Sequence, residues 1–404
     1  MFSGHEPGTP AYRGMLLALF AGGVATFSQL YAVQGLLPVI AEYFAVSSSD
    51  AALTVSAATL GLALAVTPWA IISDGIGRRR VIAIALVASV VLGLLSSAAP
   101  SFQWLVAIRF LEGIALAGVP GSALAYLVDE VSAKTVAVAS GTYISGTTLG
   151  GLAGRLLAGF AGEPAGWRWG IAAVSLMAAL ATLFFLAKAP AARGFTPIRN
   201  QNLRSIGAKF AQALRGRMVL LYAQGFLLMG GFVAVYNYLA FRLEAPPFLI
   251  PTSLAALVFL AYLSGTYTSV ASGKLVIKFG RKNTLLGSIF TSVLGLIATL
   301  SGSLVVIIAG LLVFTAGFFA AHAVASGWVP VLASQARAQA ASLYNLFYYI
   351  GSSLLGWLIG IPFMGHGWPL VVLCVGGLQL AAMLLASFLR PPRSRWPAGI
   401  HYIP

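Results

Sequence analysis

Twelve apolar runs, each long enough to cross a membrane as a helix, divide this chain almost from end to end. A helix needs about 20 apolar residues to cross the roughly 30 Å of hydrocarbon in a bilayer. In lipid a helix satisfies its own backbone hydrogen bonds, whereas an open sheet leaves edge groups unpaired. The sequence therefore predicts an all-α membrane protein with twelve transmembrane helices. The runs lie at about 14–39, 50–72, 79–99, 102–128, 135–160, 168–188, 217–241, 252–277, 284–301, 304–330, 338–361 and 369–389.

Composition and charge agree with this interpretation. The chain of 404 residues is 59% hydrophobic and 8% charged, whereas soluble domains carry about 25% charged residues. With the N-terminus inside, the positive-inside rule places both termini in the cytoplasm. The net charge of +15 then reflects topology, and we expect no nucleic-acid partner. The inside segments would hold 20 of the 24 Lys and Arg residues: Arg13, Arg78, Arg79, Arg80, Lys134, Lys188, Arg193, Arg199, Arg204, Lys209, Arg215, Arg217, Lys274, Lys278, Arg281, Lys282, Arg337, Arg390, Arg393 and Arg395.

The sequence lacks the motifs of several kinds of metal-binding, nucleotide-binding and catalytic site. The single Cys374 excludes a disulfide framework and a thiolate metal cluster. Gly273-Lys274 is followed by Leu275 and is therefore no Walker A motif. Neither an HExxH motif nor a GxSxG elbow occurs. We therefore expect no enzyme activity, no metal and no cofactor.

A long polar stretch divides the chain into two halves. It is basic and separates the sixth and seventh apolar runs. Each half has a short basic loop between its second and third spans, and Gly280 lies 203 residues after Gly77 in the matching loop. An internal duplication explains this match and predicts two pseudo-symmetric bundles. The predicted parts are an N-terminal six-helix bundle over 1–188, a cytoplasmic linker over 189–216, and a C-terminal six-helix bundle with a cytoplasmic tail over 217–404.

The stretch SDGIGRRR, which contains Asp74, resembles the loop signature of the major facilitator superfamily. In that family the aspartate pairs across to the facing bundle in one state, and the arginines, here Arg78 and Arg79, bond helix ends and acids of their own bundle. The resemblance implies a state-dependent latch at the cytoplasmic side. The second loop keeps Arg281 but has Ile277 in place of the aspartate, so we expect an asymmetric latch. The alternative is that these arginines only set the topology.

Two further stretches extend this resemblance along the chain. AIRFLEGIALAG (107–118) is similar to the fourth-span signature of the family, and GTTLGGLAGRLLAG (146–159) is similar to the fifth-span signature of its antiporters, with Thr147 in place of a proline. Together with FVAVYNYLAFRL (232–243), they place the chain nearest to the bacterial YnfM-like or arabinose-efflux-like transporters. The resemblance implies a transporter of small molecules in the lipid bilayer, which we expect to be a monomer.

Ionisable side chains within the spans are few and costly in hydrocarbon, at about 2.5–3.5 kcal/mol at a helix centre. Arg109 and Glu112 lie three residues apart on one helix face, and Arg155 should lie at a similar depth. We therefore predict a cluster of the three, in which Glu112 is either a protonatable coupling group or half of a static ion pair. His322 is a second coupling candidate, because its side chain titrates near neutral pH; the alternative is a neutral, hydrogen-bonded core histidine.

Amides and tyrosines within the spans are candidates for binding substrate. Such side chains combine an apolar body with one polar group, which suits an amphiphilic solute. Aromatic residues near span ends are equally typical of the membrane interface. The candidates are Gln29, Gln34, Tyr236, Asn237, Tyr238, Tyr344, Asn345 and Tyr348.

Gly146, Gly150 and Gly154 recur every four residues along the fifth span. A stripe of small residues lets another helix approach closely. We predict a helix-packing role, either as static packing or as a contact that changes between states.

These observations predict a secondary transporter that works by rocking two bundles about a central site. The preferred mode is efflux of a small amphiphilic or anionic compound in exchange for protons. The first alternative is uptake of an organic anion by symport or facilitated diffusion. An enzyme or a non-transporting membrane scaffold is the alternative from another class.

Overall fold

The computed structural model describes residues 4–132, 135–197, 203–333 and 336–389, which form helices and connecting loops. Five of the basic residues predicted to lie inside fall outside the described residues, as does the predicted tail over 390–404. These five are Lys134, Arg199, Arg390, Arg393 and Arg395.

The first half contains six spans, two of which are interrupted. Span one changes to a 3₁₀ turn ahead of Pro38, and span four is broken ahead of Pro120, because proline lacks a backbone donor and clashes with the preceding turn. The sequence prediction missed both breaks. The elements are α1 (Pro10–Tyr31), η1 (Ala32–Leu36), α2 (Leu37–Phe44), α3 (Ser48–Ile76), α4 (Arg78–Ser97), α5 (Phe102–Leu116), α6 (Pro120–Glu130), α7 (Val136–Ala165) and α8 (Trp167–Lys188).

The second half repeats this plan after a short linker helix. Spans eight and nine follow each other without a loop and together form α12 (Tyr262–Ala298). They meet at Gly280, whose φ of 77° only glycine adopts readily. The elements are α9 (Leu203–Ala213), α10 (Met218–Glu244), α11 (Thr252–Ala256), η2 (Leu257–Ala261), α12 (Tyr262–Ala298), α13 (Leu304–Leu332), α14 (Arg337–Leu358), α15 (Gly360–His366) and α16 (Trp368–Ser387).

All twelve predicted spans are helices in the structure. Ten helical stretches of the described chain are long and apolar enough to cross a membrane. One of these, 252–298, holds two spans on either side of Gly280. The remaining predicted span is α7, which is not among the ten; it is rich in glycine and threonine and contains Arg155.

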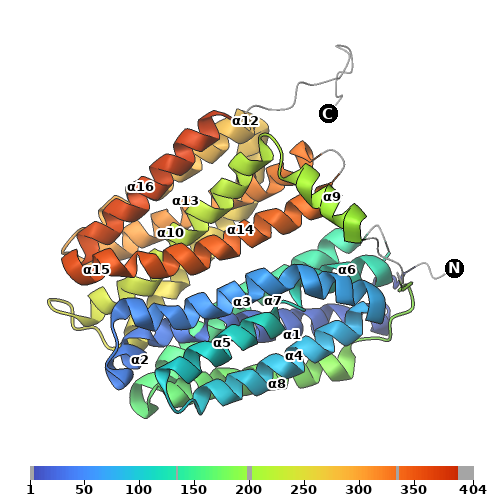
Figure 1. The fold of residues 1–404 in the computed structure, drawn as a ribbon, viewed down its shortest axis with the longest axis horizontal. Coiled ribbons are helices and arrows are strands. Elements are labelled where there is room, and N and C mark those ends of the chain that lie inside the picture. Colours follow the sequence, from blue (N-terminus) through green and yellow to red (C-terminus); the bar gives the residue numbers. More distant parts are fainter. Residues whose placement is uncertain (1–3, 133–134, 198–202, 334–335, 390–404) are drawn as a thin grey trace.

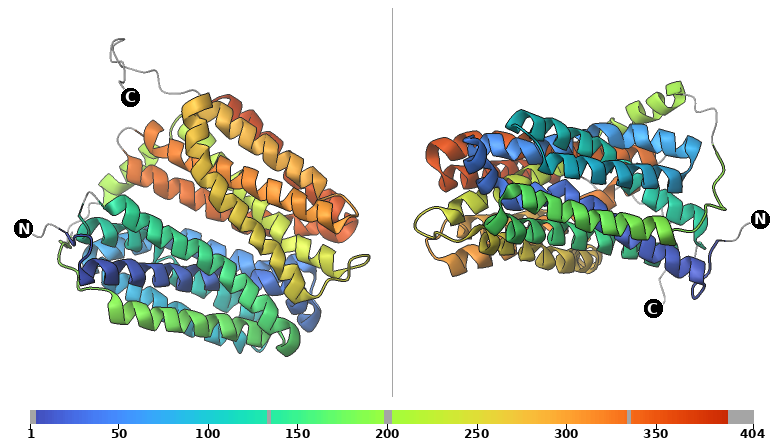
Figure 2. Two further views of the ribbon diagram at one scale, coloured as in Figure 1. Left: turned by 180° about the vertical axis from the view of Figure 1, so that it is seen from behind. Right: turned by 90° about the horizontal axis from the view of Figure 1, so that it is seen from below.

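The helices group into two bundles with matching internal contacts (Figures 1 and 2). In the first bundle α1 packs along α7, and α3 packs along α5. In the second bundle α10 packs along α14, and α12 packs along α13. These are the same pairings of spans, because spans one and five correspond to spans seven and eleven, and spans two and four to spans eight and ten.

The bundles are joined at one end. We call the end that carries Arg13, Arg78, Lys188 and Arg281 the basic end, and the opposite end, which carries α2 and α15, the far end. α3 contacts α14 and α15, and α11 contacts α7. The hydrogen bonds that cross between the bundles lie toward the far end, and the two bundles diverge toward α9 at the basic end (Figure 1).

The glycine stripe of span five packs directly on α1. A Cβ added to Gly146 would lie 2.3 Å from the carbonyl oxygen of Phe20, and one added to Gly154 would lie 2.4 Å from that of Ser28. The two backbones can approach this closely only because these positions lack side chains. The stripe therefore packs helices within the N-terminal bundle.

Replacing Gly150 by valine should lower the stability of this bundle. A Cβ there would lie 2.5 Å from the Cα of Val24, so α7 would have to move away from α1. Overpacking of this kind typically costs about 1–3 kcal/mol. We expect a lower melting temperature in detergent than for Gly141→Val, a control on the same helix whose Cβ would meet nothing within 4 Å. Equal melting temperatures for the two variants would contradict this packing.

Candidate functional site

Side chains at the interface between the bundles bond mainly to the backbone of the opposite bundle. The Ser353 hydroxyl donates to the carbonyl oxygen of Ser56 at 2.8 Å, and the Ser49 hydroxyl donates to that of Trp357 at 3.3 Å. At the far end the carboxylate of Glu163 accepts a hydrogen bond from the backbone N–H of Ser253 at 2.6 Å. These bonds hold the two bundles together near the ends of α3, α7 and α14.

Two buried amides meet at the centre of this interface. Gln34 Nε2 donates to Asn237 Oδ1 at 2.7 Å, and Asn237 Nδ2 donates to the carbonyl oxygen of Gly356 at 3.1 Å. The two residues lie 203 positions apart, the same offset that relates Gly77 to Gly280. Equivalent positions of the duplicated halves therefore face each other, as expected on a pseudo-two-fold axis.

Arg155 on α7 extends this bridge and lies among aromatic rings. Its Nε donates to Gln34 Oε1 at 2.8 Å, and its Nη2 donates to the Tyr262 hydroxyl at 3.3 Å. The guanidinium carbon lies 4.4, 4.8 and 4.9 Å from the ring centroids of Tyr31, Tyr262 and Phe259. We call Arg155, Gln34, Asn237 and these three aromatic residues the Arg155 site.

Arg155 is 3% exposed and forms no ion pair with a described residue. Its remaining hydrogen bond goes to the carbonyl oxygen of Gly151 at 2.6 Å. The ring faces offset part of the cost of burying a cation, because they carry negative partial charge. The site therefore holds a positive charge next to apolar walls without a counter-ion.

The predicted cluster of Arg109, Glu112 and Arg155 is wrong, because Arg155 lies apart from the other two. Arg109 and Glu112 are both 1% exposed and pair at 2.6 Å inside the N-terminal bundle. Arg109 also donates to the carbonyl oxygens of Leu30 at 2.7 Å and Thr54 at 3.3 Å. α7 presents Arg155 to the C-terminal bundle, whereas α5 presents Arg109 to α1 and α3.

Gln29 also lies away from the interface, against the prediction that it binds substrate. Its Nε2 donates to the Ser89 hydroxyl at 3.1 Å within the N-terminal bundle. Gln34 lies five residues later, in the 3₁₀ turn that follows α1, so it does not continue the helix face of Gln29. The two glutamines of span one therefore point to different partners.

The predicted tyrosines of the second half have different surroundings. The Tyr236 hydroxyl lies 2.7 Å from the Thr315 hydroxyl inside the C-terminal bundle, and its ring packs 5.0 Å from that of Tyr262. The Tyr238 hydroxyl donates to the carbonyl oxygens of Gly356 and Trp357 at 3.0 and 2.9 Å, which fixes the end of α14.

His322 lies toward the middle of α13 beside two of the predicted tyrosines. Its Nδ1 is 2.9 Å from the Tyr344 hydroxyl, and its ring centroid is 4.7 Å from that of Tyr348. The His322 side chain is half-buried, whereas Asn345 on α14 is exposed. This group lies in the C-terminal bundle, whereas Glu112 pairs with Arg109 inside the N-terminal bundle.

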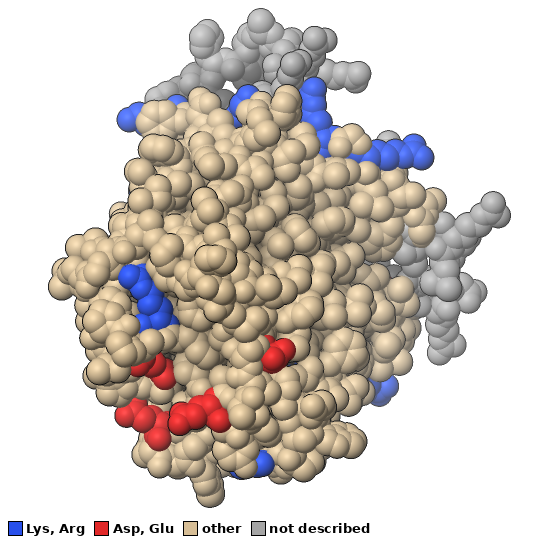
Figure 3. All heavy atoms as spheres, turned by 60° about the vertical axis from the view of Figure 1, so that its left-hand side comes forward, with Lys and Arg blue, Asp and Glu red and all other residues tan. Residues whose placement is uncertain are grey.

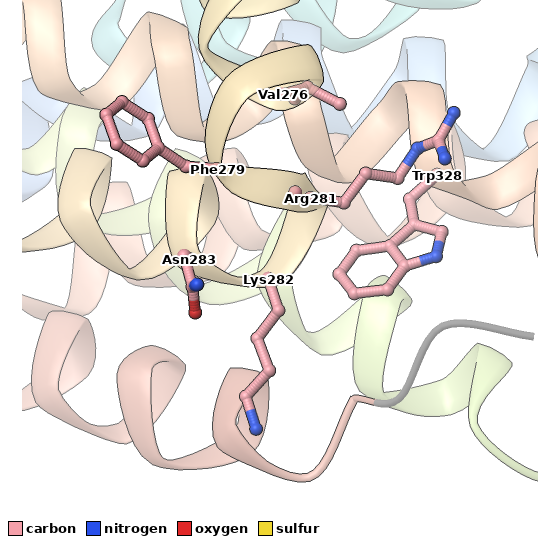
Figure 4. A pocket seen from close by; sticks show the side chains of 7 residues that line it. Val276, Phe279, Arg281, Lys282, Asn283 and Trp328 are labelled. Carbon is pink, nitrogen blue, oxygen red and sulfur yellow. The ribbon is translucent and has the colours of Figure 1, made fainter.

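Arg78 and Arg79, the predicted latch arginines of the first half, bond to groups of that half in this structure. Arg78 forms ion pairs with Asp74 and with Asp129, the latter at 3.4 Å. Arg79 donates to the carbonyl oxygens of Ala189 and Leu186 at the end of α8. Arg281 in the second half instead lines a pocket of 340 Å³ beside Trp328 (Figure 4).

Sequence reasoning missed several residues that the structure brings into these groups. Asp129 completes the ion pairs of Arg78, and Glu130 accepts hydrogen bonds from the backbone N–H groups of Arg193 and Gly194, both at 2.7 Å. The adjacent pair of acids at the basic end of span four is a usable sequence signal. Nothing in the sequence distinguishes Tyr262 from other aromatic residues.

Comparison with known proteins gives consistent matches. Residues 19–266 match the model of the Major Facilitator Superfamily. The chain is 37% identical over 383 residues to the inner membrane transport protein YnfM of Escherichia coli (strain K12), covering 95% of this chain and 90% of that protein. It is 35% identical over 383 residues to the MFS-type transporter YybF of Bacillus subtilis (strain 168), covering 95% of each. A mutant of the nucleoside transporter NupG has a similar fold, with a TM-score of 0.78 at 16% identity, covering 92% of this chain and 99% of that one.

Removing one side of the Arg109–Glu112 pair should destabilise the protein strongly. Glu112→Ala leaves a buried guanidinium without its carboxylate, a change that typically costs about 3–5 kcal/mol. We expect a much lower melting temperature than for Glu6→Ala, which removes an exposed carboxylate. The double variant Arg109→Leu/Glu112→Leu should regain part of the loss. A double variant less stable than Glu112→Ala would show that the carbonyl contacts of Arg109 matter more than the pair.

Proposed function

This chain belongs to the Major Facilitator Superfamily, and from that premise we propose that it carries a small organic anion across the membrane by alternating access. The protein is a membrane transporter and not an enzyme. We propose two further properties, namely the anionic class of the solute and the direction in which it is transported.

The observation that carries this proposal is the uncompensated charge of Arg155. A buried cation without a negatively charged partner is unfavourable in hydrocarbon, so a site that retains one usually needs the charge for its function. A carboxylate of the solute would supply the missing counter-ion, because the planar guanidinium pairs well with carboxylates. The rings of Tyr31, Phe259 and Tyr262 would enclose the apolar body of the solute.

Binding at this position would also affect the contact between the bundles. Arg155 donates to Gln34, which in turn donates to Asn237 of the other bundle. A solute that accepts the hydrogen bond of Arg155 Nε in place of Gln34 would weaken this bridge. Differential contacts of this kind shift a conformational equilibrium.

We assign the basic end to the cytoplasm, because the positive-inside rule places the short basic loops there. The present arrangement, joined at the far end, would then be the state that is open toward the cytoplasm. In the opposite state Asp74 would leave Arg78 and close against the facing bundle. We assign the protein to the bacterial inner membrane and to a monomeric state, since one chain contains all six residues of the Arg155 site.

For energy coupling we propose efflux in exchange for protons. His322 is half-buried between Tyr344 and Tyr348, which gives a proton acceptor on α13 in the bundle opposite Arg155. Uptake of an organic anion, by symport or facilitated diffusion, is the second candidate. It is favoured by the closed ion pair of Glu112, and by the amides that span one presents in place of an acid.

Arg155→Gln should abolish stabilisation by organic anions. Charge-assisted hydrogen bonds contribute about 1.5–3 kcal/mol, so binding should weaken by about 10- to 100-fold. The measurement is a thermal-shift screen of purified protein with organic carboxylates and their uncharged amides, at two pH values. Arg155→Lys, which keeps the charge but loses the planar donor pair, should be intermediate.

The matched control for this screen is Arg168→Gln. Like Arg155, Arg168 donates to a backbone carbonyl oxygen, that of Ser97, and its guanidinium carbon lies 4.5 Å from the centroid of an aromatic ring, that of Trp167. Arg168 lies at the start of α8, however, at the far end of the molecule. This variant should respond like the wild type. Equal stabilisation by the amides, or an unchanged response of Arg155→Gln, would contradict the anion proposal.

His322→Gln should remove the effect of a pH gradient while leaving solute exchange intact. The probe is the most stabilising anion of the screen, in labelled form, measured in proteoliposomes with an acidic lumen and in counterflow without a gradient. His366→Gln, which changes an exposed histidine at the end of α15, should behave like the wild type. If gradient-driven transport survives both in His322→Gln and in Glu112→Gln, neither residue couples protons and the uptake or facilitator mode is favoured.

A further inference from the structure

Two cavities meet on α12, away from the Arg155 site. The pocket of 340 Å³ is lined by residues at the turn between spans eight and nine, including Arg281 and Lys282, and by Trp328 of α13 (Figure 4). A second cavity, of 440 Å³, lies between the two spans of α12 and against α13. Phe279 and Asn283 line both cavities, so the two are adjacent, and we call them together the α12 groove.

The basic-end part of the α12 groove has positive charge without acidic compensation. Arg281 is exposed and forms no ion pair with any residue that the structure describes, and Lys278 lies over the ring of Phe279 at 5.1 Å. Lys282 donates to the carbonyl oxygen of Ser387. The sequence contains no Asp or Glu after Glu244.

The equivalent loop of the first half shows what is missing. There Arg78 is neutralised by Asp74 and Asp129. The offset of 203 residues places Ile277 and Leu332 at the positions of these two acids. The second loop has therefore kept its arginine but lost both counter-charges, and the Ile277 side chain is 87% exposed.

Trp328 adds a second indication of a ligand. Its side chain is 1% exposed, and its Nε1 is buried without a hydrogen-bond partner among the described residues. A buried indole N–H normally finds an acceptor. Because Trp328 lines the same pocket as Arg281 and Lys282, an anionic oxygen bound there could accept this hydrogen bond.

The second cavity has the character of a site for a hydrocarbon chain. Its walls include Leu275, Phe279, Ala316, Gly317 and Ala320, with hydroxyl groups of α12 between them. It runs from the basic pocket along membrane-spanning parts of α12 and α13. A ligand for the whole groove thus needs an anionic head at the basic end and an apolar tail in the membrane.

We propose that the α12 groove binds one anionic phospholipid from the leaflet at the basic end. Its phosphate lies against Arg281 and the Trp328 N–H, and an acyl chain lies between the two spans of α12. Basic pockets between transmembrane helices bind lipid head groups in this way. The chain's own residues 390–404 are a poor alternative occupant, because they contain three arginines and no acid.

The test is a thermal-shift titration of the purified full-length protein, together with lipid counting by native mass spectrometry. Phosphatidylglycerol should raise the melting temperature and give one retained lipid, whereas phosphatidylcholine and inorganic phosphate should give a much smaller effect. Arg281→Gln should reduce the shift at least by half, because it removes the unpaired charge. Gly287→Leu should do the same by filling the groove, and a Cβ at Gly287 would meet nothing within 4 Å, so this variant should fold.

Two controls match these variants. Lys209→Gln removes an exposed cation from α9, and Gly377→Leu adds the same side chain to an open face of α16. Both should respond to phosphatidylglycerol like the wild type. An equal response to phosphatidylcholine, or a wild-type response of Arg281→Gln, would overturn the charge recognition. A wild-type response of Gly287→Leu, or equal stabilisation by inorganic phosphate, would contradict lipid binding and would show that the groove binds only a simple anion.

Discussion

The cation of Arg155, buried between two helical bundles, is the constraint on which the rest of the interface depends. Hydrocarbon gives a guanidinium no water, so its donors must bond to protein groups, and they reach Gln34, Gly151 and Tyr262. Gln34 in turn donates a hydrogen bond to Asn237 of the other bundle. Any solute or motion that changes the partners of Arg155 therefore also changes how the bundles are joined.

The duplicated halves use the same scaffold with different charges. The pairings of helices are repeated, and Gln34 and Asn237 occupy equivalent positions at the interface. The first basic loop is neutralised by its own carboxylates, whereas the second is not. We propose that this asymmetry lets the first half act as the latch for the conformational change, while the second half binds an anionic lipid.

Much of the fold could be predicted because a membrane span is encoded by one continuous apolar run. The Arg109–Glu112 pair was also accessible, since residues three apart share a helix face. The sequence did not show which neighbour that face meets, because this depends on packing between distant segments. For that reason the sequence predicts Arg155 beside Glu112 and Gln29 among the substrate-binding residues, and it gives no signal for Tyr262.

The central claim is that the far-end contact between the bundles must open during transport. A cross-link between Glu163→Cys and Ser253→Cys, in a Cys374→Ser background, would close it reversibly, because the Glu163 carboxylate lies 2.6 Å from the backbone nitrogen of Ser253. A short bifunctional methanethiosulfonate reagent joins the two thiols without the specific Cβ geometry that a direct disulfide needs. The control is Ser97→Cys/Arg168→Cys within one bundle, where Arg168 donates to the carbonyl oxygen of Ser97 at 3.1 Å. Solute flux should stop when the first pair is linked and return on reduction, while the control stays active. Undiminished flux through a fully cross-linked Glu163→Cys/Ser253→Cys protein would contradict the account.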